Sequence, residues 1–192
     1  MAAQGSKCKA KIVQAADQLF YMNGYNQTSF SDIANETSIP RGNFYYYFKT
    51  KDEILTAVLD YRNQQVVEML EVCEKSSDEP KKQLLFLLEI LVREEDNIIK
   101  YGCPIGTLSS ELSKTSVDMQ KQVAVIFETM RVWIDDKLSA AGFSHRSQAL
   151  SMEILSRLQG TTLLANVYHD IEFLRRSAKQ HKLWLTELLK NH

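Results

Sequence analysis

The chain has 192 residues, of which 44% are hydrophobic and 24% charged, with a formal net charge of −1; this is the balance of an ordinary folded protein. Only seven glycines and three prolines occur, and this scarcity of breakers argues against a β-sandwich, a collagen-like repeat or a disordered tail. The near-neutral total also lacks the basic excess usual in nucleic-acid-binding domains.

Three helices are expected in quick succession at the start of the chain. An apolar stripe predicts a first helix that ends near Gly24. The stripe consists of Ile12, Ala15, Ala16, Leu19 and Phe20. Ser29 and Asp32 have the spacing of a capping box, which opens a short second helix. Pro40 then suits the first turn of a third helix, over 41–48.

Six further helices are expected along the rest of the chain, without any repeat, low-complexity segment or strand-period run. They begin at Asp52, Pro80, Pro104, shortly after Leu112, near Ser147 and at Ile171. The sequence therefore predicts an all-α fold of about nine helices, in which a three-helix N-terminal domain is followed by a larger helical domain.

No apolar run approaches the roughly 20 residues that span a bilayer, and the N-terminus lacks the apolar block of a signal peptide. The three cysteines (Cys8, Cys73, Cys103) form no CxxC pair, so neither a disulfide framework nor a zinc site is expected. The four histidines lie far apart, and no phosphate loop, GxSxG elbow or paired-acid motif occurs. We therefore expect a cytoplasmic protein that is not an enzyme and has no cofactor, no metal and no membrane partner.

The third helix has an unusual content. Phe44 and Phe48, four residues apart, can face inward, but so short a helix cannot also bury the three tyrosines between them. The tyrosine hydroxyls, Arg41 and Asn43 must then face outward. Guanidinium, amide and phenol groups on one exposed face suit the reading of base edges and the binding of phosphates. Two short helices joined by a tight turn over 29–48 form a helix-turn-helix arrangement.

Three runs of residues carry a family resemblance. They are Gly24-Tyr25, Thr28-Ser29-Phe30-Ser31-Asp32-Ile33-Ala34, and Ile39-Pro40-Arg41-Gly42-Asn43-Phe44-Tyr45-Tyr46-Tyr47-Phe48-Lys49-Thr50-Lys51-Asp52-Glu53-Ile54-Leu55. In this order they resemble the DNA-binding signature of the tetracycline-repressor (TetR) family, although Ser38 stands in the turn where the family commonly has glycine. The resemblance implies a DNA-binding domain over 1–51 and a ligand-binding and dimerisation domain over 52–192.

The resemblance also implies roles for individual residues. Thr28 and Ser29, with the amides at the start of their helix, would hold a phosphate, which a helix N-terminus favours. Arg41 and Asn43 would enter the major groove and face guanine and adenine respectively, while Gly42 allows close approach.

Five more residues complete the implied contacts. Tyr45 and Tyr46 would contact phosphates or thymine methyl groups, unless one of them is partly packed. Lys51, and more weakly Lys49, would bind backbone phosphate. Tyr47 stands where the family commonly has histidine, so its own contact stays open.

The last helix carries a candidate dimer seam, since helix-turn-helix proteins usually bind palindromes as two-fold dimers. Its members recur at spacings of three and four residues: Ile171, Leu174, Ala178, His181, Leu185 and Leu188. In the preceding helix, Gly160 and Thr161 are small enough to let two backbones cross closely. The alternative is that both helices close the core of their own monomer. The resemblance, in which the last two helices form a four-helix interface, favours the seam.

A ligand site is harder to place. Six side chains are candidates for lining it, with plain core packing as an equal alternative for each: Phe86, Tyr101, Phe127, Met130, Trp133 and Tyr168. Cys103 precedes Pro104 at an expected helix N-terminus, where the helix dipole favours a thiolate. The run from Gly102 to Leu112 also resembles a segment in a TetR subgroup, some members of which sense electrophiles or oxidants through that cysteine. A small buried hydrophobe is the alternative for Cys103.

The distribution of charge supports a nucleic-acid partner. Residues 1–51 hold six basic and three acidic side chains, whereas 52–192 hold seventeen and twenty-one, so the neutral total conceals a basic first part. We therefore expect a transcriptional regulator, most simply a repressor that binds a palindromic operator in double-stranded DNA as a homodimer. A small hydrophobic or electrophilic inducer, or thiol modification, would release it. The alternatives are an all-helical ligand-binding or catalytic protein with a vestigial helix-turn-helix, and a protein-interaction bundle.

Overall fold

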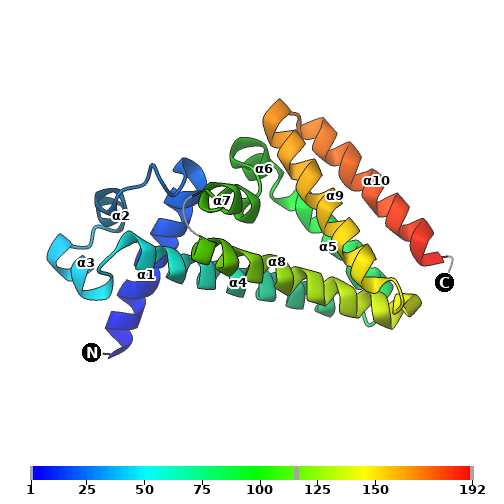
Figure 1. Ribbon diagram of the computed structural model, residues 1–192, viewed down its shortest axis with the longest axis horizontal. Coiled ribbons are helices and arrows are strands. Elements are labelled where there is room, and N and C mark those ends of the chain that lie inside the picture. The colour runs from blue at the N-terminus through cyan, green and yellow to red at the C-terminus, as the bar shows by residue number, and fades with distance from the viewer. Residues whose placement is uncertain (1, 115–116, 191–192) are drawn as a thin grey trace. The chain divides into compact units, whose positions relative to one another are not determined.

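The computed structural model describes residues 2–114 and 117–190, and the side chains of 5–40, 42–90, 93–114 and 117–190. Helices account for most of these residues, and no strand occurs among them (Figure 1). In chain order they are α1 (Ala2–Asn23), α2 (Phe30–Thr37), α3 (Arg41–Tyr47), α4 (Lys51–Lys75), α5 (Pro80–Arg93), α6 (Glu95–Tyr101), α7 (Pro104–Leu112), α8 (Val117–Leu138), α9 (Ser147–Tyr168) and α10 (Ile171–Lys190). A π-helical turn, η1 (Ser139–Phe143), lies between α8 and α9. The all-α class is confirmed.

Most helix ends follow the expected rules. Pro80 occupies the first turn of α5, as predicted. Pro40 is instead the N-cap of α3, because its ψ of 135° is still extended and helical dihedrals begin one residue later. Ser38 ends α2 in the left-handed conformation, at φ 55°, and donates its N–H to the carbonyl of Asn35 at 3.2 Å. Serine thus adopts the conformation that glycine more often supplies.

The short helix α6 was not among the nine expected helices. The chain departs from helical dihedrals at Glu94, whose φ and ψ are −105° and 22°, although neither glycine nor proline occurs there. Acidic residues in the first turn of α6 interact favourably with the positive end of its dipole. One of them, Glu95, accepts hydrogen bonds from Arg175 of α10 at 2.5 and 2.9 Å. The start of α6 is thus accompanied by a contact with α10, a segment distant in the sequence. Local sequence patterning does not reveal such a contact.

The described chain divides into two compact units. The first takes in Met1–Gln64 with Thr107–Ile126, and the second Gln65–Gly106 with Phe127–His192. The domain boundary expected between residues 51 and 52 stays a prediction. Within the described ranges, no helix is both long enough and apolar enough to cross a membrane.

The core of the first unit is formed by the apolar faces of α1 to α4. Ile12 of α1, Ile33 of α2 and Phe44 of α3 are fully buried, and α2 packs directly on α1. Arg62 of α4 is also buried and donates to the carboxylate of Asp17 on α1. Burial raises the pKa of Asp17, while the guanidinium of Arg62 acts in the opposite direction. This core holds α2 and α3 against α1.

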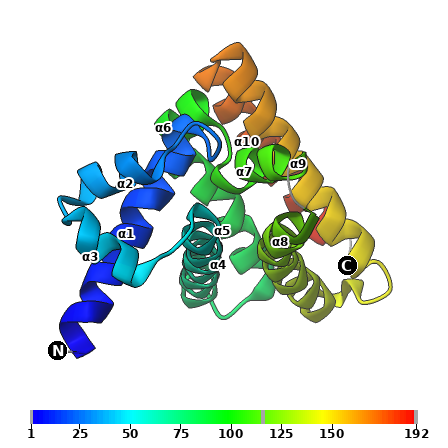
Figure 2. The ribbon, with the colours of Figure 1, turned by 60° about the vertical axis from the view of Figure 1, so that its left-hand side comes forward.

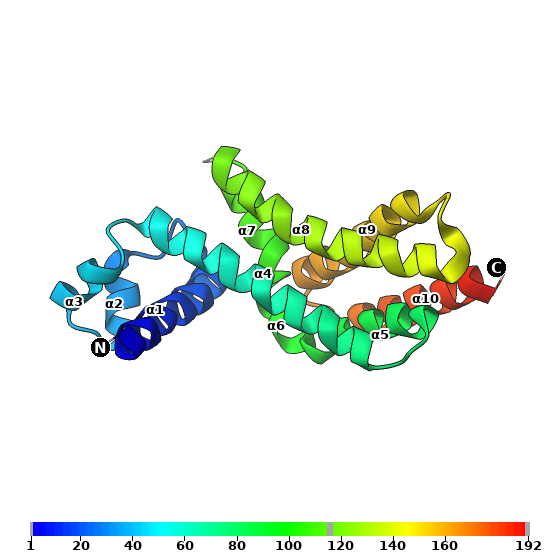
Figure 3. The ribbon, with the colours of Figure 1, turned by 90° about the horizontal axis from the view of Figure 1, so that it is seen from below.

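In the second unit, α10 lies along α5 and α9 (Figure 3). Four residues of the predicted dimer seam are buried inside the monomer. They are Leu174, Ala178, Leu185 and Thr161. The spacing of these four residues reflects packing inside their own chain, and a seam formed by the last two helices stays a prediction. The half-buried His181 completes this packing, with its Nε2 2.8 Å from Oγ1 of Thr161. Ile171, Leu188 and Gly160 are half-buried.

The outer side of α9 instead exposes a set of large apolar side chains. They are Met152, Leu163, Leu164, Val167 and Tyr168. Ala149 and Ser156 on the same helix are exposed as well. Monomeric proteins rarely expose contiguous apolar surface of this kind without a partner for it.

The environment of His181 makes the stability of the fold depend on pH. Burial lowers the pKa of His181 below its usual range, and the nearby charge of Arg157 adds to this. The folded state therefore binds fewer protons than the unfolded state below about pH 6.5, so the free energy of unfolding falls as the pH decreases. In urea titrations at pH 7 and pH 5, we expect His181→Gln to lose less stability than the wild type. The exposed His145, changed to Gln, serves as the control, and an equal loss in all three proteins would contradict the prediction.

Candidate nucleic-acid interface

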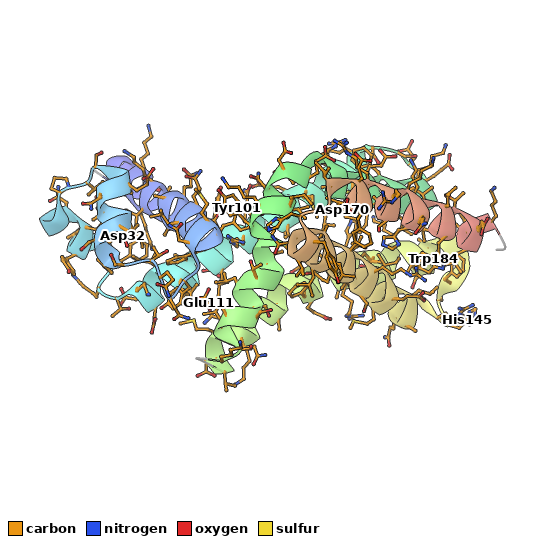
Figure 4. All side chains as sticks on the ribbon, turned by 90° about the horizontal axis from the view of Figure 1, so that it is seen from above. Asp32, Tyr101, Glu111, His145, Asp170 and Trp184 are labelled. Carbon is orange, nitrogen blue, oxygen red and sulfur yellow. The ribbon has the colours of Figure 1, made fainter. Side chains whose placement is uncertain are left out.

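The N-terminus of α2 is closed by the predicted capping box. The amide N–H of Asp32 donates to the hydroxyl of Ser29 at 3.1 Å, and the Asp32 carboxylate accepts the Ser29 amide N–H at 2.7 Å (Figure 4). These hydrogen bonds hold the pKa of Asp32 below its usual range. Ser29 is exposed, and its hydroxyl acts here as an acceptor, so the hydroxyl proton can still be donated outward. The position suits an anion at the helix end.

Thr28 is placed differently from its neighbour. Its side chain is 1% exposed, and its hydroxyl donates to the carbonyl of Gly24 at 2.8 Å. The phosphate contact predicted for this side chain is therefore corrected: the hydroxyl stabilises the loop between α1 and α2. The cause is the turn at Gly24, whose φ of +86° brings its carbonyl within reach of Thr28.

Lys51 has a similar part in the same loop. Its Nζ donates to the carbonyls of Tyr25 at 2.9 Å and Thr28 at 3.1 Å, and it lies 4.2 Å from the centroid of the Tyr25 ring. The Tyr25 hydroxyl donates to the carboxylate of Asp52, and burial together with this bond raises the pKa of Tyr25. The ammonium group of Lys51 thus stabilises the loop between α1 and α2, although the sequence predicted that it binds phosphate.

Glu111 of α7 holds the loop from the other side. Its carboxylate accepts the amide N–H of Tyr25 at 2.9 Å and that of Asn26 at 2.6 Å (Figure 4 labels Glu111). Sequence reasoning missed this residue, because 86 positions separate it from Tyr25 and no local motif marks it. The loop between α1 and α2 is therefore fixed by charged groups from two helices, α4 and α7.

The packing of α3 agrees with the predicted division of its side chains. Phe44 and Phe48 are buried, and the ring of Phe30 on α2 packs edge-on against Phe44 at 4.8 Å and stacks on Tyr45 at 5.2 Å. Tyr45 is 52% exposed and Tyr46 is 79% exposed. These two tyrosines therefore lie at the surface, and Tyr45 is held there by stacking.

The rest of the α3 surface is open. Gly42 and Asn43 are exposed, and a Cβ added to Gly42 would meet no other atom within 4 Å, so nothing in the described chain requires glycine there. Tyr47 is half-buried and packs edge-on against Tyr46 at 5.3 Å. Lys49 donates its ammonium to the carbonyl of Tyr45 at the end of α3. The backbone of Arg41 starts α3, and its side chain lies outside the described set.

The predicted ligand-site residues do not share one kind of environment. Tyr168 is 74% exposed, which contradicts its place in an interior pocket. Met130 is buried, whereas Phe86, Tyr101, Phe127 and Trp133 are half-buried. The indole N–H of Trp133 donates to Glu74 at 3.1 Å. Phe86 lines an open groove of about 760 Å³ with Val72 and Leu85.

Cys103 lies just before α7 and is partly buried. The amide N–H of Gly106 and the side-chain amide of Gln159 on α9 donate to its Sγ at 3.4 and 3.5 Å. Both contacts place a polar donor beside the sulfur. Within the described chain, no group of three or more His, Cys, Asp or Glu side chains could hold a metal ion.

Two family models match the sequence. The model for bacterial regulatory proteins of the tetR family matches residues 12–58, which contain α2 and α3. The model for the C-terminal domain of LmrA/YxaF-like transcriptional regulators matches residues 85–180.

Several transcriptional regulators are similar to this chain over most of its length and of their own. An HTH-type regulator in the lacX 3' region of Lactococcus lactis subsp. lactis is 35% identical, over 86% of this chain and 87% of its own. The HTH-type regulator LmrA of Bacillus subtilis (strain 168) is 25% identical, over 82% and 85%. Among solved structures, a TetR transcriptional regulator from Chloroflexus aurantiacus J-10-FL has a TM-score of 0.84 at 21% identity, covering 96% of each chain. A TetR regulator from Legionella pneumophila has a TM-score of 0.80 at 24% identity, covering 93% and 95%.

The role of Glu111 can be measured in the protein alone. We expect Glu111→Ala to lower the free energy of unfolding by about 1–3 kcal/mol, because two backbone N–H groups lose their acceptor. Amide exchange at Tyr25 and Asn26 should accelerate, which NMR or mass spectrometry detects. Glu36→Ala, which removes an exposed carboxylate of α2, is the matched control. Unchanged exchange in the loop would show that Glu111 does not hold it.

Proposed function

Because the chain belongs to the tetR family of transcriptional regulators, we propose that it is a repressor that binds a palindromic operator in double-stranded DNA as a homodimer. A small hydrophobic or electrophilic molecule, or thiol modification, would then release it. The observation that carries this proposal is the surface of α3, where Gly42, Asn43, Tyr45 and Tyr46 are exposed over the buried Phe44. Seven helical residues with this division suit insertion into the major groove.

The proposed contacts with DNA are of two kinds: some read bases, and others bind phosphates or thymine methyl groups. Arg41 and Asn43 read bases in the major groove, and the open space over Gly42 lets the DNA approach the backbone of α3. Ser29, Tyr45, Tyr46, Tyr47 and Lys49 supply phosphate or thymine contacts around them. We assign Thr28 and Lys51 to the loop between α1 and α2, since Thr28 is buried and the half-buried Lys51 already serves two carbonyl groups there. Lys49 is exposed and serves a single carbonyl group, so it keeps donors for DNA.

The outer side of α9 supports the homodimer. Its apolar side chains include Met152 and Leu163, at 53% and 60% exposure, with the small residues Ser156 and Gly160 between them along the helix. A self-complementary contact between two copies of this surface would bury it and would place two copies of α3 on a two-fold operator. We propose that this surface of α9 adds to the seam predicted from Gly160 and the half-buried residues of α10.

The surroundings of Cys103 support release through thiol modification. Its Sγ accepts a hydrogen bond from Gln159, which belongs to α9. A group attached to Sγ would displace this amide and so disturb the helix that we propose to form the dimer. Binding of a non-covalent small-molecule ligand is the alternative way in which we propose that the protein is released from DNA.

Selection of bound sequences from random duplex DNA tests the operator and the dimer together. We expect two inverted half-sites about 10 base pairs apart, or a multiple of that spacing, because one copy of α3 reads each half. Non-palindromic sequences bound with one protomer per duplex would contradict the homodimer. Failure to bind any duplex would contradict the function.

Two substitutions on α3 then separate DNA contact from folding. Gly42→Ala should leave the free energy of unfolding unchanged or raise it by up to about 1 kcal/mol, because alanine favours a helix, yet lower operator affinity, because its methyl group stands in the groove. Asn43→Ala should cost about 1–3 kcal/mol on the operator and relax the choice of one base pair. Gln120→Ala, exposed on α8, should change neither quantity. Normal operator affinity in both α3 variants would exclude α3 as the reading helix.

Thiol sensing is tested on the protein–operator complex with N-ethylmaleimide. We expect the reagent to release the wild type and Cys8→Ser but not Cys103→Ser, with release followed by fluorescence anisotropy of the labelled duplex. Release that persists in Cys103→Ser would exclude Cys103 as the sensor.

A further inference from the structure

The start of α1 lies outside the region that matches the family model. The helix begins at Ala2, whereas the match begins at residue 12, so more than two helical turns precede it. This segment carries Lys7, Lys9 and Lys11, and no acidic residue occurs in the sequence before Asp17. Half of the six basic residues in 1–51 therefore lie in this one segment.

All three lysines are exposed. Elsewhere in the described chain, several exposed lysines sit beside carboxylates: Lys75 pairs with Glu71 and Lys82 with Glu79. None of the ion pairs found among the described residues involves the lysines of α1. Their charges are thus concentrated and uncompensated by a close carboxylate, which raises the local positive potential.

The segment lies beside the end of α3. A Cβ built on Gly5 would be 4.0 Å from Cε1 of Tyr47, and Nζ of Lys9 is 5.5 Å from the centroid of the Phe48 ring. The first turns of α1 also extend past α3 (Figure 2). Lys9 therefore lies against Phe48 at the end of α3, while Lys7 and Lys11, four residues apart, share another side of α1.

We propose that this lysine segment of α1, residues 5–11, forms a second contact with double-stranded DNA, on backbone phosphates that flank the bases read by α3. The inference rests on the proposed function. Lysine is a flexible point charge without the planar fork of arginine, so the contact adds affinity without reading sequence. It lengthens the bound stretch of DNA beyond the half-site.

The chemistry of the segment favours DNA over a membrane surface. Helices that bind lipid carry large apolar side chains on the face opposite their basic residues. Here the exposed positions of 5–11 are occupied by Ser6, Ala10 and the three lysines, which offer nothing to insert into a bilayer. Because the segment lies next to α3, the phosphates of DNA come close to it once α3 is in the major groove.

The test compares the triple variant Lys7→Gln, Lys9→Gln, Lys11→Gln with the wild type on the selected operator. The dissociation constant is measured over a range of salt concentrations. For each phosphate that the variant no longer neutralises, the slope of log K against log salt should become shallower by about 0.9. The triple variant should also bind operator and random duplex more weakly by the same factor. Trimming the duplex to the half-sites should weaken the wild type but not the triple variant.

The control carries the same change of charge in the second unit, as Lys75→Gln, Lys82→Gln, Lys100→Gln, all exposed positions. Circular dichroism establishes that each variant is folded. A shallower slope in the α1 variant alone supports the inference. An unchanged slope, an equal change in the control, or a loss confined to the operator overturns it, while wild-type binding shows that the proposed function stands. No binding by the wild type would instead refute the proposed function.

Discussion

The surface of the first unit depends on the fact that a seven-residue helix can bury only one side. Phe44 and Phe48 take that side of α3 and pack into the core formed with α1 and α2. The other described side chains of α3 are then left at or near the surface, including aromatic ones that would ordinarily be buried. The stacking of Phe30 on Tyr45 holds one of these at a fixed angle. The hydrophobic effect in the core thus determines which polar groups face outward, and the exposed groups themselves contribute little to stability.

A second constraint concerns the loop that leads into α2. Its polar backbone groups cannot all be satisfied locally, since a turn offers few partners. Lys51 serves two of its carbonyls and Glu111 two of its amides, and Thr28 closes the turn from within. This arrangement fixes the start of α2, where the capping box lies, relative to α4 and α7. Charged groups of the kinds that also bind external ligands are used here to position a helix.

Whether a feature could be predicted from the sequence depends on how far apart along the chain its interacting residues lie. The capping box, the buried pair Phe44 and Phe48 and the start of α5 each depend on residues at most four apart, and all were predicted. Glu111 depends on a partner 86 positions away and was missed. The same limit applies to Thr28 and Lys51: a motif gives the residue type, but the available carbonyls decide its use.

The spacing of apolar residues in α10 has a related ambiguity. Positions three and four apart show that a helix packs along another helix, but they do not say whether that helix belongs to the same chain. Leu174 and Leu185 are fully buried by their own monomer, so the regular spacing is already explained. The apolar surface on α9 has no such explanation, because Leu163 and Val167 remain 60% and 59% exposed. An interface between two copies is therefore better inferred from what the monomer leaves uncovered than from the most regular pattern in its sequence.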